Sequence, residues 1–183
     1  MAPTAVDLPR IHLAAAEIHI TRKPEVVETV LGSCVAATLW VPRLQVGAMC
    51  HGALPWCPEE HLRCADFLRG FRYVDFAIRY LACRLFRLGV RPGEIEVKLF
   101  GGADVLQMLR PRRAASVGRQ NCDAAMKTLS DEGLSPVVSD LGGRNGRVIY
   151  FHTDCGDVYV RRLPSGGASG ELDLEREPSE DSI

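Results

Sequence analysis

The sequence predicts an α+β domain in which layered mixed β-sheets are flanked by two helices. Short apolar runs separated by glycine and proline recur along the chain, which is typical of strands joined by turns. Two longer stretches repeat their apolar residues every three to four positions, which indicates amphipathic helices. Without any internal repeat, we expect a single domain over residues 11–163, a flexible N-terminus over 1–10 and a disordered acidic tail over 164–183.

Composition is that of an ordinary globular protein. The 183 residues are 46% hydrophobic and carry a formal net charge of −1. That length can bury a core, and that charge gives no general attraction to nucleic acid. The first residues lack the basic and apolar blocks of a signal peptide, and no apolar run has the length needed to cross a membrane. We therefore expect a cytoplasmic protein without membrane insertion, nucleic-acid partner or cofactor.

The chain contains seven cysteines. An odd number without a signal peptide argues against a disulfide framework and for reduced thiols. Most free cysteines are small buried side chains, so at most one or two are expected to carry chemistry. The seven are Cys34, Cys50, Cys57, Cys64, Cys83, Cys122 and Cys155.

Strands are expected wherever a short apolar or alternating run is bounded by turn residues. The runs Val35–Val41 and Val46–Met49 flank Pro42-Arg43, which predicts a hairpin. Ile95–Phe100 alternates charged and apolar residues, which predicts a strand with one buried face. Gly156 is expected to supply the tight position of a second hairpin. The other predicted strands are Ile11–Ile20, Glu25–Leu31, Leu134–Ser139, Val148–His152 and Val158–Arg162.

Two helices are expected, over Tyr73–Leu88 and Gly118–Glu132. Gly89 and Gly133 follow them, where a left-handed residue commonly ends a helix. Apolar residues at three-and-four spacing form the inward faces. These residues are Val74, Ala77, Ile78, Leu81, Ala82, Leu85 and Leu88 in the first helix, and Cys122, Ala125, Met126 and Leu129 in the second.

The first hairpin brings a thiol and an imidazole to one end of a sheet. Cys34 follows the Gly32-Ser33 bend at the start of one strand, and His51 lies at the end of the next. A thiol beside an imidazole is sufficient for nucleophilic catalysis, and backbone amides at the bend would form an oxyanion site. The imidazolium would also favour a thiolate at neutral pH. The alternative is that Cys34 is one more buried thiol.

A rival interpretation is a zinc site formed by Cys50, His51, Cys57, His61 and Cys64. Thiolate and imidazole suit zinc, but these spacings do not match paired Cys-x2-Cys ligands. Adjacent residues of a strand also face opposite sides, which would separate the first two ligands. We therefore predict no metal, and the irregular segment that holds the last three is expected to cover the thiol and imidazole as a flap.

Six stretches of the chain occur together in a known family. They are Leu31-Gly-Ser-Cys-Val-Ala, Gly47-Ala-Met-Cys-His-Gly-Ala-Leu-Pro, Arg72-Tyr-Val-Asp-Phe-Ala-Ile, Lys98-Leu-Phe-Gly-Gly-Ala, Val117-Gly-Arg-Gln-Asn and Asp140-Leu-Gly-Gly-Arg-Asn-Gly-Arg. With them the chain resembles the CheD family of chemoreceptor glutamine deamidases. The likeness runs in unbroken order over roughly Glu17 to Leu163, so it is more specific than any single motif.

The resemblance implies a cysteine hydrolase fold similar to that of the cytotoxic necrotizing factor deamidases. It implies a protein-glutamine glutaminase that deamidates glutamines on the cytoplasmic domains of methyl-accepting chemoreceptors and so supports chemotaxis adaptation. Some members also hydrolyse receptor glutamate methyl esters, and some bind a CheC-type phosphatase. The family's nucleophile falls on Cys34 and its histidine on His51, with backbone N–H groups near Ser33 and Cys34 as the oxyanion site.

The third catalytic residue is where this chain departs from the family pattern. The resemblance implies a threonine six positions before the cysteine, and Glu28 occupies that position. Thr29 stands one position later, where a regular strand would point it to the opposite face unless a bulge intervenes. A Glu28 carboxylate would also be able to orient His51. The substitution keeps open an alternative function, a weakly active or inactive adaptor that binds chemoreceptors or a CheC-type phosphatase.

Overall fold

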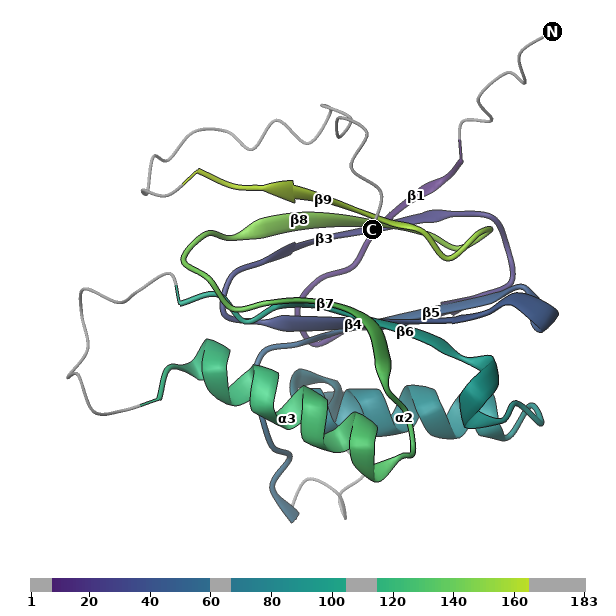
Figure 1. Ribbon diagram of the computed structural model, residues 1–183, viewed down its shortest axis with the longest axis horizontal. Helices are drawn as coiled ribbons and strands as arrows, with labels where there is room; N and C mark the ends of the chain where they lie inside the picture. Colours follow the sequence, from purple (N-terminus) through teal and green to yellow (C-terminus); the bar gives the residue numbers. More distant parts are fainter. Residues whose placement is uncertain (1–7, 60–66, 105–114, 165–183) are drawn as a thin grey trace, which may run out of the picture.

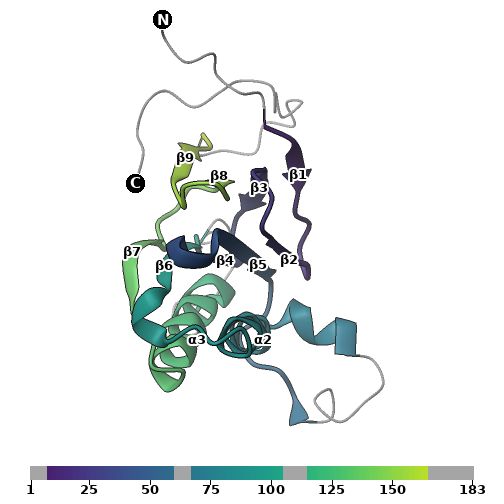
Figure 2. The same ribbon diagram turned by 90° about the vertical axis from the view of Figure 1, so that its right-hand side faces the viewer.

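The computed structural model describes residues 8–59, 67–104 and 115–164, which form three layers. Two sheets lie face to face, and two helices cover the outer face of one of them (Figures 1 and 2). This arrangement confirms the predicted α+β class with layered sheets and flanking helices. The predicted tail over 164–183 lies almost entirely outside the described residues, and so does most of the predicted flexible start.

Both sheets are mixed. In the four-stranded sheet β1 runs parallel to β3, and the remaining neighbours are antiparallel. In the five-stranded sheet only β6 and β7 are parallel. The four-stranded sheet contains, in spatial order, β1 (Arg10–His12), β3 (Val26–Leu31), β8 (Arg147–His152) and β9 (Val158–Arg162). The five-stranded sheet contains β2 (Ile18–Thr21), β5 (Val46–Gly52), β4 (Val35–Val41), β6 (Glu96–Gly101) and β7 (Pro136–Leu141).

The two helices are α2 (Val74–Phe86) and α3 (Val117–Asp131). Gly89 and Gly133 have φ angles of 77° and 71°, which confirms the expected left-handed residues after each helix. Short 3-10 turns occur at Pro42–Leu44 (η1), Phe67–Arg72 (η2) and Pro92–Glu94 (η3). Within the described ranges, no helix has the length and apolar character needed to cross a membrane.

Two residues predicted to face inward are exposed. Leu88 is 48% exposed because α2 ends at Phe86, so the helical phase no longer directs its side chain to the core. Met126 is 44% exposed because it lies just past the edge of the arc that α3 buries. The other predicted inward positions of both helices are buried.

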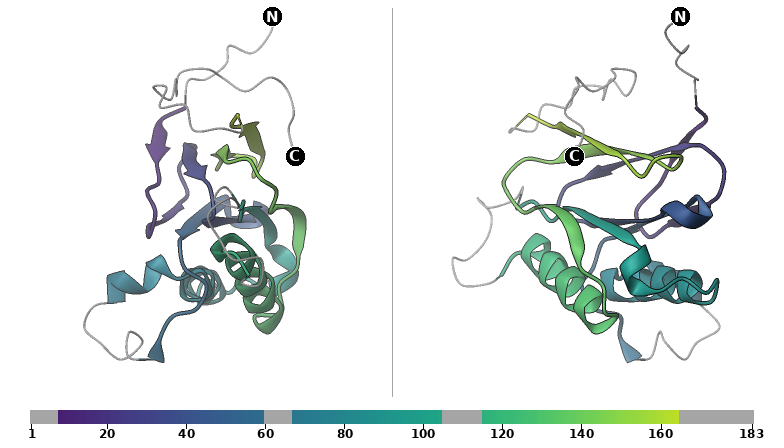
Figure 3. Two further views of the ribbon diagram at one scale, coloured as in Figure 1. Left: turned by 90° about the vertical axis from the view of Figure 1, so that its left-hand side faces the viewer. Right: turned by 45° about the vertical axis from the view of Figure 1, so that its right-hand side comes forward.

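The five-stranded sheet lies between the four-stranded sheet and the helices (Figure 3). The core therefore has two main parts, one on each side of the five-stranded sheet. Side chains such as Val97 and Leu99 pack against the helices, whereas Phe100 packs between the two sheets. The prediction that Ile95–Phe100 buries only one face was therefore wrong. β6 has helices on one side and the second sheet on the other, so almost every residue in it is buried.

The single strand predicted over Ile11–Ile20 is in fact two strands in different sheets. A turn separates them, in which the Glu17 N–H donates to the Ala14 carbonyl at 3.2 Å and Ala16 has a φ of 69°. The chain thus crosses from one sheet to the other. The Ala16 N–H donates to the His51 carbonyl at 2.8 Å, so this crossing lies beside the end of β5.

Candidate active site

The β4–β5 hairpin brings Cys34 and His51 to the same end of the five-stranded sheet, on the face that packs against the other sheet. Ala36 pairs with His51 across the hairpin, and Cys34 lies two residues before Ala36. Residues two apart in extended chain share a face, so Cys34 and His51 are diagonal neighbours with Cα atoms about 7–8 Å apart. Cys34 is partly exposed and packs at the margin of the core between the sheets.

Thr29 fixes the orientation of the His51 ring. Its Oγ1 lies 2.8 Å from His51 Nδ1 and donates to the Leu13 carbonyl at 2.6 Å. Because the hydroxyl proton is used on Leu13, the Thr29 oxygen accepts, and Nδ1 must carry the ring proton. His51 Nε2 is then a lone-pair acceptor, and it is buried with no hydrogen-bond partner among the described residues. Both side chains are almost fully buried.

Glu28 does not contact His51. Thr29 pairs with Ile149 in a register that turns the odd-numbered residues of β3 toward the five-stranded sheet, so Glu28 faces the opposite way. The Glu28 carboxylate lies 3.9 Å from Arg10 and 3.8 Å from His12. Of the two candidates for the third position, it is Thr29 that lies beside the imidazole, and it reaches the ring without a bulge.

Burial disfavours the charged form of both the Cys34 thiol and the His51 imidazole. It lowers the pKa of the His51 imidazole and raises the pKa of the Cys34 thiol. From the sequence we expected an imidazolium that stabilises a thiolate before any substrate is attacked. These two pKa shifts oppose that expectation. The arrangement is suited instead to proton transfer from Sγ to Nε2 at the moment of attack.

Two glycines bring the end of another strand close to the loop that holds Cys34. The Gly102 N–H donates to the Cys34 carbonyl at 2.7 Å, and a Cβ at Gly101 would lie 2.2 Å from that carbonyl oxygen. Gly101 and Gly102 have φ angles of 110° and 66°, a backbone conformation that glycine adopts without steric cost. Ser33, which precedes Cys34, is partly buried in the same loop.

One buried polar residue near the site was not predicted. Asn121 of α3 donates to the carbonyl of Ser33 and to that of Ala53. These two hydrogen bonds join the loop that holds Cys34 to the segment after His51. Its position in the stretch Val117–Asn121 was the only available signal, because an asparagine in a helix gives no hint of a distant partner.

The ligands of the rival zinc site do not converge where the structure describes them. Cys50 is buried against the helices, on the opposite side of β5 from His51, and burial raises the pKa of its thiol to about 12. Cys57 is partly buried, and its Sγ lies 3.7 Å from the Pro58 carbonyl oxygen. His61 and Cys64 lie outside the described residues, as does much of the predicted flap. The described residues contain no cluster of three or more His, Cys, Asp or Glu suited to a metal.

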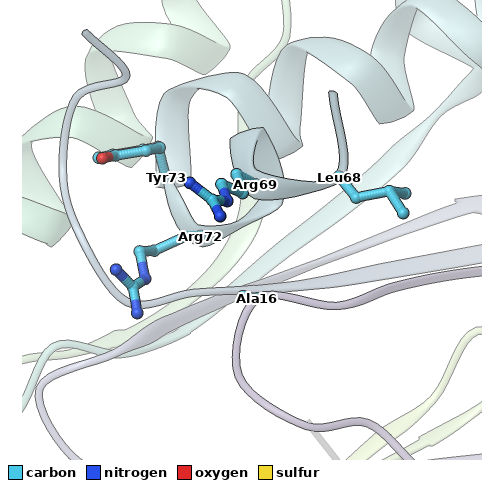
Figure 4. A pocket seen from close by; sticks show the side chains of 5 residues that line it. All are labelled: Ala16, Leu68, Arg69, Arg72 and Tyr73. Atoms are coloured by element: carbon cyan, nitrogen blue, oxygen red, sulfur yellow. The ribbon is translucent and has the colours of Figure 1, made fainter. Parts of the chain in front are cut away.

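A pocket of about 500 Å³ lies at the same end of the five-stranded sheet (Figure 4). One wall is Ala16, whose N–H bonds to the His51 carbonyl. The other walls of the pocket are formed by residues in and next to η2, which are Leu68, Arg69, Arg72 and Tyr73. Both arginines are exposed, so the pocket is cationic.

The site has the elements of a cysteine-dependent hydrolase: a thiol, a neutral imidazole and a third polar group that orients it.

Residues 60–162 match the model of the family described as CheD chemotactic sensory transduction. A probable chemoreceptor glutamine deamidase CheD from Maridesulfovibrio salexigens is 43% identical over 86% of this chain and 94% of its own length. One from Geobacter sulfurreducens is 38% identical over 85% and 91%. The chain belongs to the CheD family.

Among solved structures, the hypothetical protein YfiH of Bacillus licheniformis shares 12% identity with this chain. The superposition covers 67% of this chain and 49% of YfiH, with a TM-score of 0.42.

Proposed function

We propose that this protein is a glutamine amidohydrolase that converts specific glutamines of bacterial chemoreceptors to glutamate. The relatives named as probable chemoreceptor glutamine deamidases match it over nearly their whole length. The observation that carries the proposal is the hydrogen-bonded series Leu13–Thr29–His51, because it leaves His51 Nε2 as an acceptor on the face where Cys34 lies.

The proposed reaction proceeds through a thioester. Nε2 of His51 takes the thiol proton as Sγ of Cys34 bonds to the glutamine carboxamide carbon, and the carbonyl oxygen becomes an oxyanion beside the Ser33–Cys34 backbone. His51 returns the proton to the amide nitrogen, the C–N bond breaks and ammonia leaves. Water, deprotonated by His51, then adds to the thioester. The C–S bond breaks, and glutamate and the free thiol are restored.

Thr29 has a supporting part in this scheme. By accepting a hydrogen bond from Nδ1–H, the Thr29 oxygen selects the tautomer in which Nε2 is basic. The same oxygen stabilises the imidazolium that forms during attack. The alternative of an adaptor with little catalysis depended on Glu28 replacing the family threonine. With Thr29 at the imidazole, that reason for preferring the adaptor is removed.

We propose chemoreceptor cytoplasmic domains as the substrates, the cytoplasm as the location and a CheC-type phosphatase as a second partner, as the family implies. A protein substrate must contact more of the enzyme than the thiol alone. The cationic pocket with Arg69 and Arg72 lies at the same end of the sheet as His51, which offers such a contact.

The test is incubation of a recombinant receptor cytoplasmic domain with the wild-type protein and with Cys34→Ala, followed by ammonia measurement and peptide mass mapping. Conversion of mapped glutamines to glutamate by the wild type alone is expected. The matched control is Cys83→Ala, since Cys83 is an exposed cysteine on α2. Receptor that stays unmodified while it binds the wild type would favour the adaptor instead.

A further inference from the structure

One side chain of α3 hydrogen-bonds to the backbone close to both the candidate nucleophile and the candidate base. Asn121 has no exposed surface. Its Nδ2 donates to the Ser33 carbonyl at 2.8 Å and to the Ala53 carbonyl at 3.1 Å. Ser33 is the residue before Cys34, and Ala53 is two residues after His51. A single amide group thus fixes the backbone on both sides of the site.

We infer that Asn121 is a positioning residue that aims the Cys34 N–H into the site as the oxyanion donor. In a trans peptide the carbonyl and the following N–H point in opposite directions. Asn121 draws the Ser33 carbonyl toward α3, so the N–H of the same peptide unit points away from α3, to the side where Sγ lies. This inference deepens the proposed function, which places the oxyanion at this backbone.

Two further observations agree with this orientation. The Cys34 N–H lies close enough to its own Sγ to favour the thiolate, although burial dominates the pKa of the thiol. Within the described ranges, no backbone carbonyl or side chain accepts that N–H, which leaves it available to a substrate oxygen. A donor held in place before the substrate arrives needs no reorganisation during attack.

The chemistry of Asn121 also fits a donor role. Its Oδ1 is buried and has no hydrogen-bond partner in the part of the chain that the structure describes, which lowers stability. An aspartate would set a carboxylate against two carbonyl oxygens, and a leucine of similar size would offer no donor. Asparagine is therefore the residue of this size that supplies both hydrogen bonds, and the unpaired Oδ1 accompanies them.

The test compares two reactions of the same thiol. Acylation by p-nitrophenyl acetate forms an oxyanion when Sγ bonds to the ester carbon, after which p-nitrophenolate leaves and His51 holds the thiol proton. Alkylation by iodoacetamide displaces iodide at a saturated carbon and forms no oxyanion. In Asn121→Leu and Asn121→Ser we expect Cys34 acylation to slow by about tenfold to a hundredfold, as for loss of an oxyanion donor, with alkylation within about twofold.

Gln120→Leu is the matched control, because Gln120 is an exposed amide on the same helix whose Nε2 donates to the Ala115 carbonyl. Rates measured with Cys34→Ala are subtracted to remove the other cysteines. Equal falls in acylation and alkylation, unchanged acylation, or failure of both variants to fold would each overturn the inference in favour of a purely structural role. A wild type that releases no ammonia from the receptor domain would count against the proposed function, and the ratio of the two rates would still decide the role of Asn121.

Discussion

At the residue scale, the candidate site depends on one buried histidine with a defined tautomer. The Thr29 hydroxyl is used twice, once as donor to Leu13 and once as acceptor from His51. The consequence is a basic nitrogen that is buried and has no hydrogen-bond partner within the described ranges, so it can accept a proton from a thiol. This arrangement gives three predictions, one for Thr29 and two for the effect of pH.

Thr29→Val should lower kcat for receptor deamidation by about tenfold or more, because Nδ1 loses the acceptor that fixes the base. Thr29→Ser keeps the hydroxyl and should keep most of the activity. The measurement is steady-state ammonia release. Thr128→Val is the control for a buried threonine, since its Oγ1 has no hydrogen-bond partner among the described residues. Equal activity in Thr29→Val and the wild type would contradict a role for this hydroxyl.

Acid should inactivate the enzyme at a pH below the ordinary imidazole value. Burial lowers the pKa of His51, so the base stays neutral below about pH 6.5, and kcat/KM should fall only as the pH drops further. The measurement is the pH profile of kcat/KM, which reports groups of the free enzyme. An acid limb centred at or above that value would contradict the assignment.

The same shift links His51 to stability. The unfolded chain binds more protons than the native state between the lowered pKa and about pH 6.5, so the free energy of unfolding should fall as the pH drops through that window. Urea unfolding at several pH values measures this fall. In His51→Gln, the part of this fall in the free energy of unfolding that is due to the imidazole should disappear.

At the element scale, a buried arginine joins the two sheets. Arg147 of β8 is fully buried and forms an ion pair with Asp140 of β7 at 2.9 Å. It also donates to the carbonyls of Asp140 and Gly142. Arg162 of β9 adds a second, exposed ion pair to the same carboxylate at 2.8 Å. The turn between β7 and β8 is thereby fixed to the edges of both sheets.

Arg147→Met should lower the free energy of unfolding by about 3–5 kcal/mol, because it leaves buried carbonyls and part of a carboxylate without a partner. Arg147→Lys should recover little of this, since an ammonium cannot serve three acceptors in the same plane. The matched control is Arg162→Met, where the pair is solvent-exposed and about 1 kcal/mol or less is expected. Similar losses in both variants, measured by urea unfolding, would show that burial of Arg147 is not what matters.

At the scale of the whole molecule, the site lies between layers that come from distant parts of the chain. His51 belongs to the five-stranded sheet, and Cys34 to the loop that leads into its strand β4. Thr29 belongs to the four-stranded sheet and Asn121 to the helical layer. The layers must pack together before the hydrogen bonds around His51 and Asn121 can form. The core between the sheets, with Phe100 and Phe151, is therefore part of what assembles the site.

A fragment limited to residues 60–162, the part that matches the family model, should not fold by itself. It lacks β3, the neighbour of β8, and β4, the neighbour of β6, so both sheets would lose a central strand. Circular dichroism and urea unfolding of the fragment beside a chain of residues 8–164 provide the measurement. A cooperative transition in the fragment would contradict this account.

The sequence by itself determined the local features. Period-two and three-and-four patterns predicted the β4–β5 hairpin and both helices, and Gly89, Gly133 and Gly156 marked positive φ angles that the structure contains. These features depend on residues close together in the chain. The thiol and imidazole were also within reach of sequence reasoning, because a hairpin brings its two ends together.

The tertiary structure decided which residues meet across layers. Whether Glu28 or Thr29 faces His51 depends on how β3 packs against the other sheet, and a shift of one residue reverses the answer. The contact of Asn121 with Ser33 spans 88 residues, so no local pattern indicates it. Burial of His51 and Cys34, and hence the direction of both pKa shifts, likewise follows only from the packed layers. Contacts between distant segments depend on relative placement, which local periodicity does not encode.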